Sequence, residues 1–319
     1  MNEDLDGVLE LRVEQLRRES DGVLSVTLAD PEGGALPAWA PGAHIDLEFP
    51  GMVRQYSLCG DPADRFTYKV AVLREEASRG GSAHIHEVLR PGDLVEVGGP
   101  RNHFALVPAP RYLFVGGGIG ITPLLPMLAG AEAEGVAWTL VYGGRSRATM
   151  GFLDDLARHG TKVRVVPEDE SGRLDLDALL AETPAGTAIY TCGPGGLLDA
   201  LAERCAALGR SDDLHLERFQ AKTFDIDPSD EHAFDVVCGR SGLTVEVPAD
   251  RSILSSLEEA GIGVPWACQD GICGSCEVKI LDGAADHRDS LLTPAQQESG
   301  QTLMVCVSRA LGDRLVLDL

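Results

Sequence analysis

Four cysteines near the end of the chain have the spacing of an iron–sulfur centre. Cys268, Cys273 and Cys276 follow the pattern C-x4-C-x2-C, and Cys306 comes later in the chain. Plant-type 2Fe–2S proteins have this spacing, with four thiolates holding two irons. A structural zinc site and four unrelated buried cysteines are the alternatives, but zinc knuckles are usually paired and only one pair fits here. The pattern therefore predicts a one-electron carrier of low potential, about −400 mV in this class.

A glycine-rich segment at residues 116–123 has the sequence Gly-Gly-Gly-Ile-Gly-Ile-Thr-Pro. It ends an apolar run and opens a stretch that is typical of a helix. Glycines let a phosphate approach the backbone, and the N-terminus of a helix favours its negative charge. The segment is not a strict G-x-G-x-x-G, so a tight strand-to-helix turn is the alternative. We expect a dinucleotide site that includes Gly117, Gly118 and Gly120.

Two later segments follow other apolar runs of the same region. Residues 192–194, Cys-Gly-Pro, would place a small thiol at the carboxyl edge of a parallel sheet, where ligands of open α/β folds bind. Residues 145–147, Arg-Ser-Arg, would meet the adenosine end of the dinucleotide. A buried core cysteine and a solvated turn are the respective alternatives. Because arginines also accommodate a 2′-phosphate, the second segment leaves NADPH open beside NADH.

Residues in the first third of the chain could hold a flavin. Arg54, Tyr56 and Ser57 lie on one strand-like run, where an aromatic ring beside a hydroxyl can stack on a flavin ring and bind its polar edge. Arg79 and two glycines precede Ser82 at the start of a helix-like stretch. Arginine, backbone amides and a hydroxyl in that position can hold a phosphate. Core packing of the tyrosine is the alternative.

The elements that must position these residues change along the chain. Residues 1–107 contain short alternating runs and Pro-Gly turns, which predict the strands of a small antiparallel barrel. Residues 108–224 alternate apolar strands with helix-like stretches, which predicts a parallel sheet with crossover helices. Residues 225–232 are polar and contain proline, as in a linker, and residues 233–319 form the third part. We expect strands at 9–14, 23–28, 44–49, 54–58, 66–73, 94–97, 112–115, 138–142, 162–166, 187–191, 233–238 and 243–247, and helices at 84–89, 124–134 and 252–260.

The composition excludes several classes of function. The 319 residues carry 50 acidic and 27 basic side chains, a formal net charge of −23, which disfavours nucleic acid and anionic membranes as partners. No run approaches the roughly 20 apolar residues of a membrane span, and the chain opens with acidic residues rather than a basic signal-peptide start. We therefore expect a cytoplasmic protein. Eight cysteines in a chain of this length do not form a disulfide scaffold.

Taken together, these motifs resemble the phthalate dioxygenase reductase family, which includes the vanillate demethylase reductases. The resemblance covers essentially the whole chain and lies in the order of the motifs: 54–57, 79–82, 116–123, 192–194 and the cysteine tail. It implies a multidomain α/β plus β protein with an FMN-binding antiparallel β-barrel, a Rossmann-like NAD(P)-binding domain of the ferredoxin–NADP reductase type and a C-terminal β-grasp plant-type ferredoxin domain.

The resemblance also implies roles for individual residues. Around the flavin they are Arg54, Tyr56 and Ser57 for the ring and ribityl chain, Val72 and Leu73 through their backbone, and Arg79, Gly81 and Ser82 for the phosphate. Around the nucleotide they are Thr122, Cys192, Gly193 and Pro194 at the nicotinamide, and Phe219, in the matching segment 217–219, against the flavin face. Arg145, Ser146 and Arg147, predicted above at the adenosine end, depart from the family, which mostly uses NADH. Residues 286–289, Asp-His-Arg-Asp, also look like a family segment near the cluster, with a solvated charged loop as the alternative.

The function implied is electron transfer from NAD(P)H through FMN and the 2Fe–2S cluster to an oxygenase component. A Rieske-type aromatic-ring oxygenase or O-demethylase is the expected acceptor, and a cytochrome P450 is a second one. An iron–sulfur redox sensor without turnover and a zinc-binding, flavin-free relative are alternatives of a different class. We expect a monomer whose acidic ferredoxin face docks on a basic patch of the acceptor.

Overall fold

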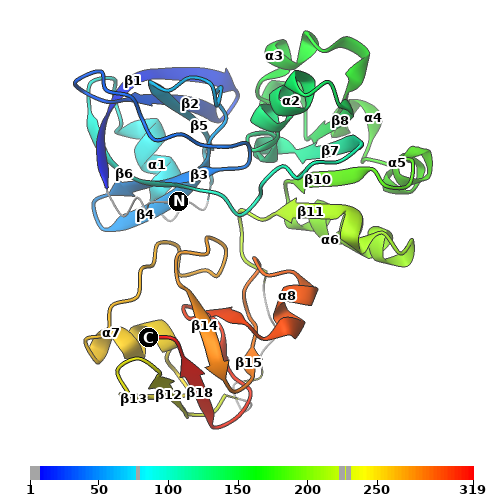
Figure 1. Ribbon diagram of the computed structural model, residues 1–319. Coiled ribbons are helices and arrows are strands. Elements are labelled where there is room, and N and C mark those ends of the chain that lie inside the picture. The colour runs from blue at the N-terminus through cyan, green and yellow to red at the C-terminus, as the bar shows by residue number, and fades with distance from the viewer. Residues whose placement is uncertain (1–7, 77–79, 223–226, 228–230) are drawn as a thin grey trace. The chain divides into compact units, whose positions relative to one another are not determined.

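The computed structural model describes residues 8–76, 80–222, 227 and 231–319. The chain divides into two compact units, residues 1–219 and 220–319. The first unit contains two sheets, and the second contains the cysteine-rich tail (Figure 1). Among the described residues, no helix is long and apolar enough to cross a membrane.

The N-terminal sheet of the first unit is antiparallel, with the strand order β4-β3-β6-β1-β2-β5. A bridge between Leu58, just after β4, and Val70 of β5 connects the two ends of this order, so the sheet closes into the expected barrel. Alternate residues point inward, as Leu11 and Val13 do on β1. The elements are β1 (Leu9–Ser20), β2 (Val23–Ala29), β3 (His44–Phe49), β4 (Met52–Ser57), β5 (Thr67–Leu73), α1 (Gly81–Glu87) and β6 (Leu94–Arg101).

Strand β1 is twice as long as the alternation predicted. It was expected to end at residue 14, but its pairing with β2 continues to Ser20. The register shifts at Val13/Gln15 and again at Arg18/Ser20. Such bulges change which residues face inward, so charged positions in the second half remain compatible with a strand.

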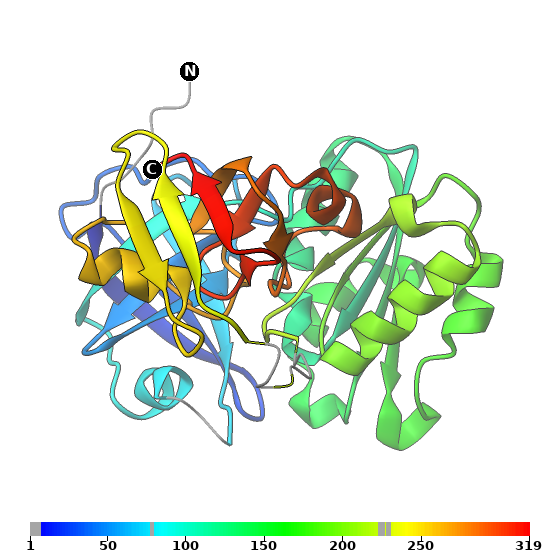
Figure 2. The same ribbon diagram turned by 90° about the horizontal axis from the view of Figure 1, so that it is seen from below.

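The second sheet of the first unit is parallel, with the order β11-β10-β7-β8-β9. Both of its faces are buried, as in α/β folds. Phe114 of β7 packs with α2 on one face, whereas Leu113 packs with α6 on the other (Figure 2, α6 in yellow-green). The strands are β7 (Arg111–Gly117), β8 (Ala137–Gly144), β9 (Val163–Pro167), β10 (Ala188–Cys192) and β11 (Leu214–Glu217). The helices are α2 (Leu124–Ala133), α3 (Leu153–Ala157), α4 (Glu168–Ser171), α5 (Leu176–Glu182) and α6 (Gly195–Ala207), with 3-10 turns η1 (Gly118–Ile121), η2 (Arg147–Thr149), η3 (Gly160–Lys162) and η4 (Ser211–Asp213).

The glycine segment differs in detail from the expectation. Strand β7 continues through Gly116 and Gly117 instead of ending at Val115, and η1 separates it from α2. Glycine can continue the strand because residues 116 and 117 pair with Tyr142 and Gly143 of β8. Strand β7 lies between β8 and β10, which is where the order of the sheet reverses and where ligands of such folds bind.

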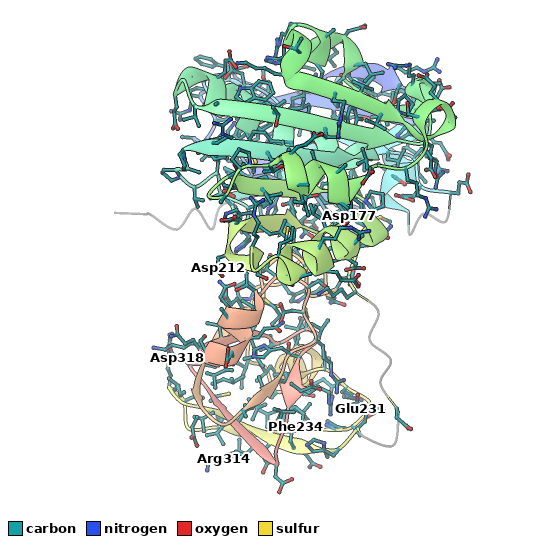
Figure 3. All side chains as sticks on the ribbon, turned by 90° about the vertical axis from the view of Figure 1, so that its right-hand side faces the viewer. Asp177, Asp212, Glu231, Phe234, Arg314 and Asp318 are labelled. Atoms are coloured by element: carbon teal, nitrogen blue, oxygen red, sulfur yellow. The ribbon has the colours of Figure 1, made fainter. Side chains whose placement is uncertain are left out.

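The second unit has a mixed sheet in the order β13-β12-β18-β14-β16 and a separate pair, β15-β17. Its core contains Val236, Leu257 and Leu315. Arg309 is buried; its guanidinium lies 5.0 Å from the Phe234 ring centroid and its Nε 2.8 Å from Glu231. Phe234 and Glu231 are labelled in Figure 3. The elements are β12 (Phe234–Cys238), β13 (Thr244–Val247), α7 (Ile253–Glu259), β14 (Glu277–Asp282), β15 (Ala285–Asp286), α8 (Pro294–Ser299), β16 (Thr302–Met304), β17 (Arg309–Ala310) and β18 (Arg314–Leu317).

Candidate active site and iron–sulfur centre

The four cysteines of the tail come together in the second unit. Cys268 lies within hydrogen-bonding reach of Cys273 and Cys306, and Cys276 lies within reach of Cys306. Hydrogen bonds from the thiols of Cys273 and Cys306, and then from nearby backbone amides, hold the pKa of Cys268 below its usual value. The backbone N–H of Asp270 donates to the Cys268 sulfur at 3.3 Å. This set of convergent sulfurs and amides fits a plant-type cluster.

The cysteine loop depends on glycine for its path. Gly271 has φ +67°, and a Cβ there would lie 3.1 Å from Cα of Asp289. The backbone N–H of Ser290 donates to the carbonyl of Gly271 at 2.9 Å. Asp289 is buried and accepts hydrogen bonds from the amides of Leu291 and Leu292. The charged segment 286–289 therefore packs against the cysteine loop and is not a solvated loop.

Cys192 and the glycine segment meet at the carboxyl edge of the parallel sheet. A Cβ on Gly120 would lie 2.3 Å from the carbonyl oxygen of Cys192, and one on Gly117 would lie 2.7 Å from Cδ of Pro194. Only glycine permits these approaches, because the first partner is backbone. A Cβ on Gly193 would lie 2.9 Å from Cα of Gly117. The two predicted segments thus form one continuous backbone surface at the switch point.

A contact between the two sheets of the first unit completes this edge. The Ser57 hydroxyl, at the end of β4, donates to the Glu217 carboxyl at the end of β11, over 3.3 Å. Burial raises the pKa of Glu217 to about 8, while the hydrogen bond from Ser57 lowers it. Burial and then the neighbouring Glu217 raise the pKa of the Cys192 thiol. Cys192 is therefore a neutral thiol, and Glu217 is a carboxyl group that holds its proton at neutral pH.

The residues expected around the flavin are partly brought together. A Cβ on Gly81 would lie 2.7 Å from Cγ of Arg54 and 3.3 Å from the hydroxyl oxygen of Tyr56, so this glycine leaves room beside both side chains. The Ser82 hydroxyl accepts from the amide of Glu75 at 3.2 Å. Val72 and Leu73 end strand β5, and His86 Nε2 lies 3.0 Å from the carbonyl oxygen of Val72. Arg79 lies outside the described residues.

The remaining predicted residues occupy other parts of the same edge. Thr122 is buried, and its hydroxyl donates to the carbonyl of Ile119 at 3.0 Å. Phe219 follows β11 and is 37% exposed. Gly118 has φ +54°, and its carbonyl accepts from the Tyr142 hydroxyl at 3.1 Å.

The segment 145–147 lies on an exposed loop after β8. Ser146 and Thr149 form a capping box at the start of η2. Arg147 pairs with Glu170 of α4, with its Nε 2.9 Å from a carboxylate oxygen. The charge of this arginine is thus partly balanced from the next strand–helix junction, which no pattern along the sequence indicates.

The resemblance to the family covers residues 217–219 but implies a role only for Phe219, not for Glu217. The signal for Glu217 was the position of a carboxylate at the end of a short strand, two residues before Phe219. The resemblance implies no role for Arg218 either, which is buried and bonded to Asp199 of α6 at 2.5 Å. Charged residues on an edge strand usually face solvent, so neither could be recognised without the fold.

Known proteins are similar to this chain over nearly its whole length. The family model for the 2Fe–2S iron–sulfur cluster binding domain matches residues 236–311. The chain is 44% identical over 312 residues to the phenoxybenzoate dioxygenase subunit beta of Ectopseudomonas oleovorans, and the match covers 97% of each chain. A crystal structure of an intact type IV self-sufficient cytochrome P450 monooxygenase matches with 49% identity and a TM-score of 0.92, over 98% of this chain and 41% of that one. The chain thus spans about two fifths of that P450.

A further solved structure is that of phthalate dioxygenase reductase, which is described as modular, for electron transfer from pyridine nucleotides to a 2Fe–2S centre. It matches with a TM-score of 0.71 and 36% identity, over 98% of both chains. The barrel, the parallel sheet and the C-terminal ferredoxin-type unit expected from the sequence are confirmed. On these similarities, the chain belongs to the phthalate dioxygenase reductase family of NAD(P)H-dependent flavin and iron–sulfur oxidoreductases.

Proposed function

We propose that this chain is the reductase component of an oxygenase system, in which NAD(P)H is the electron donor and an oxygenase is the acceptor. The contact between Ser57 and Glu217 carries this proposal. It joins the strand that bears the flavin residues to the sheet edge where Gly120 meets Cys192. A nicotinamide bound at that edge would therefore lie beside a flavin bound on the barrel.

The cofactors are FMN and a 2Fe–2S cluster, which together convert the two electrons of a hydride into single-electron steps. We assign Arg54, Tyr56 and Ser57 to the flavin ring and ribityl chain. The space beside Gly81 supports this assignment, because a larger residue would fill it. Further flavin contacts are assigned to the backbone of Val72 and Leu73 and, at the phosphate, to Arg79, Gly81 and Ser82.

The nucleotide site follows the carboxyl edge of the parallel sheet. We assign the pyrophosphate to the glycine turn and the nicotinamide to the surface around Cys192, because these two backbones are in contact. Phe219 would cover the flavin face until nicotinamide replaces it. The proposed set is Gly117, Gly118, Gly120 and Thr122, then Cys192, Gly193, Pro194 and Phe219, with Arg145, Ser146 and Arg147 at the adenosine end.

Within this site the Glu217 carboxyl and the Cys192 thiol keep their protons and do not transfer them. Glu217 keeps a neutral carboxyl group next to the place where the flavin and nicotinamide would stack. Because this carboxyl group is neutral, it adds no negative charge beside the electron-rich flavin ring. The neutral thiol of Cys192 would give the nicotinamide pocket an apolar surface.

We assign the electron exit to Cys268, Cys273, Cys276 and Cys306. Cys268 is the most exposed of the four, so the edge of the cluster nearest to it would face an acceptor. A Rieske-type oxygenase is the proposed acceptor, in line with the names of several relatives. A P450 is a second candidate, which the match to a self-sufficient P450 favours. We expect a monomer in the cytoplasm, where the cluster thiols stay reduced, and no binding to nucleic acid.

The test is an anaerobic titration of the purified holoprotein with NADH and NADPH. We expect flavin absorbance to bleach first and the cluster to show its reduced-state paramagnetic signal afterwards. Cys273→Ser should retain flavin bleaching and lose most reduction of cytochrome c. Cys238→Ala, at a buried cysteine outside the set of four, is the matched control and should keep both. A protein with cluster but no flavin, inert to both nucleotides, would contradict the proposal.

A further inference from the structure

The loop that carries residues 145–147 is hydrogen-bonded to the flavin barrel. The backbone N–H of Asp21, in the turn between β1 and β2, donates to the carbonyl of Ala148 at 2.8 Å. The Ser20 hydroxyl donates to the carbonyl of Thr149 at 3.2 Å. These two bonds tie the η2 turn to the barrel hairpin, directly after the residues proposed to meet the adenosine.

Lys69 lies at the centre of the same contact. Its Nζ is 5.1 Å from the ring centroid of Phe152 and 3.2 Å from the carboxylate of Glu19. The Glu19 side chain is only 2% exposed, whereas the other cation near it, Arg17, is 3.7 Å away and half exposed. A buried carboxylate requires a close countercharge. Glu19 therefore holds the Lys69 ammonium group in place over the ring.

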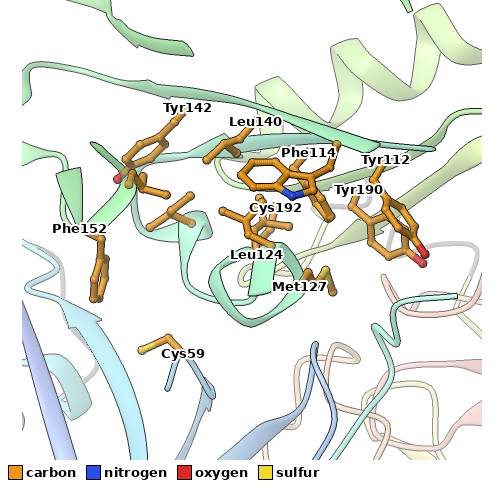
Figure 4. Close-up of a cluster of buried hydrophobic side chains, with 14 of the residues drawn as sticks. Cys59, Tyr112, Phe114, Leu124, Met127, Leu140, Tyr142, Phe152, Tyr190 and Cys192 are labelled. Carbon is orange, nitrogen blue, oxygen red and sulfur yellow. The ribbon is translucent and has the colours of Figure 1, made fainter. Parts of the chain in front are cut away.

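Phe152, whose ring faces this ammonium group, has an unusual backbone conformation. It has φ +63°, in the left-handed region that residues other than glycine rarely adopt. Its ring is buried in a cluster that joins Cys59 of the barrel to Leu124 and Met127 of α2 (Figure 4). A strained backbone persists only where its surroundings determine it. Here the surroundings include Cys59 and Lys69 of the barrel as well as residues of α2.

We propose that Lys69 is a positioning residue for the dinucleotide: from the flavin barrel it fixes Phe152, and through it the loop that receives the adenosine end. This inference rests on the proposed placement of the adenosine at residues 145–147. Because the loop lies on the nucleotide sheet and Lys69 on the barrel, nucleotide affinity depends on a contact between the two sheets of the first unit. The loop is also bound on its far side, where the amide of Asp169 donates to the carbonyl of Arg145 at 3.1 Å.

Lys69→Met tests this in the holoprotein, because it keeps the aliphatic stem and removes the charge. The measurements are KM and kcat for NADH with ferricyanide as acceptor, and the inhibition constant of ADP-ribose, which probes the adenosine half alone. Losing one partly buried cation–π contact should raise the KM and the ADP-ribose constant together, by about three- to tenfold. Saturated turnover and FMN absorbance should stay unchanged, and Lys69→Arg should restore the wild-type constants.

Lys162, in the η3 turn on the nucleotide side of the first unit, offers a more exposed control. Its Nζ lies 5.0 Å from the Trp138 ring centroid and 2.7 Å from Glu132, the same pair of contacts, but before β9 at the amino edge. Lys162→Met should therefore leave both constants unchanged. Equal constants for Lys69→Met and wild type, even with a lower melting temperature, would overturn the inference.

Arg147→Ala separates this inference from the proposed site itself. If Arg147→Ala raises the ADP-ribose constant and Lys69→Met does not, the adenosine site stands and the role of Lys69 is wrong. If neither variant changes it, the adenosine does not bind at residues 145–147 and the proposed placement fails. If Lys69→Met does not fold, Phe152→Leu removes the ring contact while leaving the Lys69–Glu19 pair, and the same increase is expected.

Discussion

The pKa of Glu217 depends on the contact between the two sheets of the first unit. The residue as a whole keeps some exposed surface, but its carboxyl group is enclosed and bonded to Ser57. Burial raises its pKa from 4.5 to about 8. Between these two values the folded chain binds a proton that the unfolded chain releases, so this group makes stability fall as pH rises. Above pH 8 its contribution becomes constant.

Glu217→Gln removes that pH dependence. Relative to the variant, the wild-type protein should lose up to about 1.4 kcal/mol of unfolding free energy for each pH unit between 5.5 and 7.5. Urea unfolding at three pH values, followed by the fluorescence of released flavin, measures the difference between the two proteins. Parallel curves for wild type and variant would show that the carboxyl group titrates as it does in water.

At the scale of elements, the glycine turn follows strand β7 at the carboxyl edge of the parallel sheet. It packs there against the backbone at the end of β10. The local alternation predicted both strands and α2, because side-chain periodicity depends on neighbours along the chain. It missed the second half of β1, where register shifts change the inward-facing residues. The alternation pattern also predicted that β7 ends two residues earlier than it does, because glycine has a low propensity for strands.

Gly120→Ala tests the fit between β7 and β10. Its Cβ would lie 2.3 Å from the carbonyl oxygen of Cys192, so the glycine turn must shift. We expect the KM for NADH to rise at least about tenfold, because an error of about 1 Å at a binding surface has effects of that size or larger. FMN absorbance should not change. Gly130→Ala in α2 is the control: the nearest atoms to its Cβ would be 3.6 Å away, and alanine in a helix favours stability by roughly 0.5–1 kcal/mol.

At the scale of the whole molecule, the excess of acidic residues is largest in the part that carries the cysteines. Residues 226–319 have 16 acidic and six basic side chains. Four of those six basic residues, Arg240, Arg251, Arg288 and Arg309, are paired with carboxylates of the same unit. The field of this unit is therefore negative, which favours an acceptor with a basic surface.

Raising the ionic strength should weaken electron transfer to a basic acceptor. With cytochrome c as the probe, the KM should increase several-fold between about 10 mM and 500 mM salt, as the screening length falls from about 30 Å to below 10 Å. Ferricyanide, a small anion, serves as the control and should not show this increase. A KM for cytochrome c that is independent of salt would contradict docking through the acidic unit.

The sequence alone determined which cofactors to expect and the order of the domains. It did so through local patterns: the cysteine spacing, the glycine segment and the change from alternating strands to strand–helix units. Which residues meet was decided by tertiary structure. Ser57 and Glu217 are 160 residues apart and touch only because β4 and β11 end at the same place. Lys69 and Phe152, and Arg147 and Glu170, likewise pair between elements that are far apart in the sequence. Such contacts depend on strand order and on how two sheets pack, and side-chain periodicity along one chain contains neither.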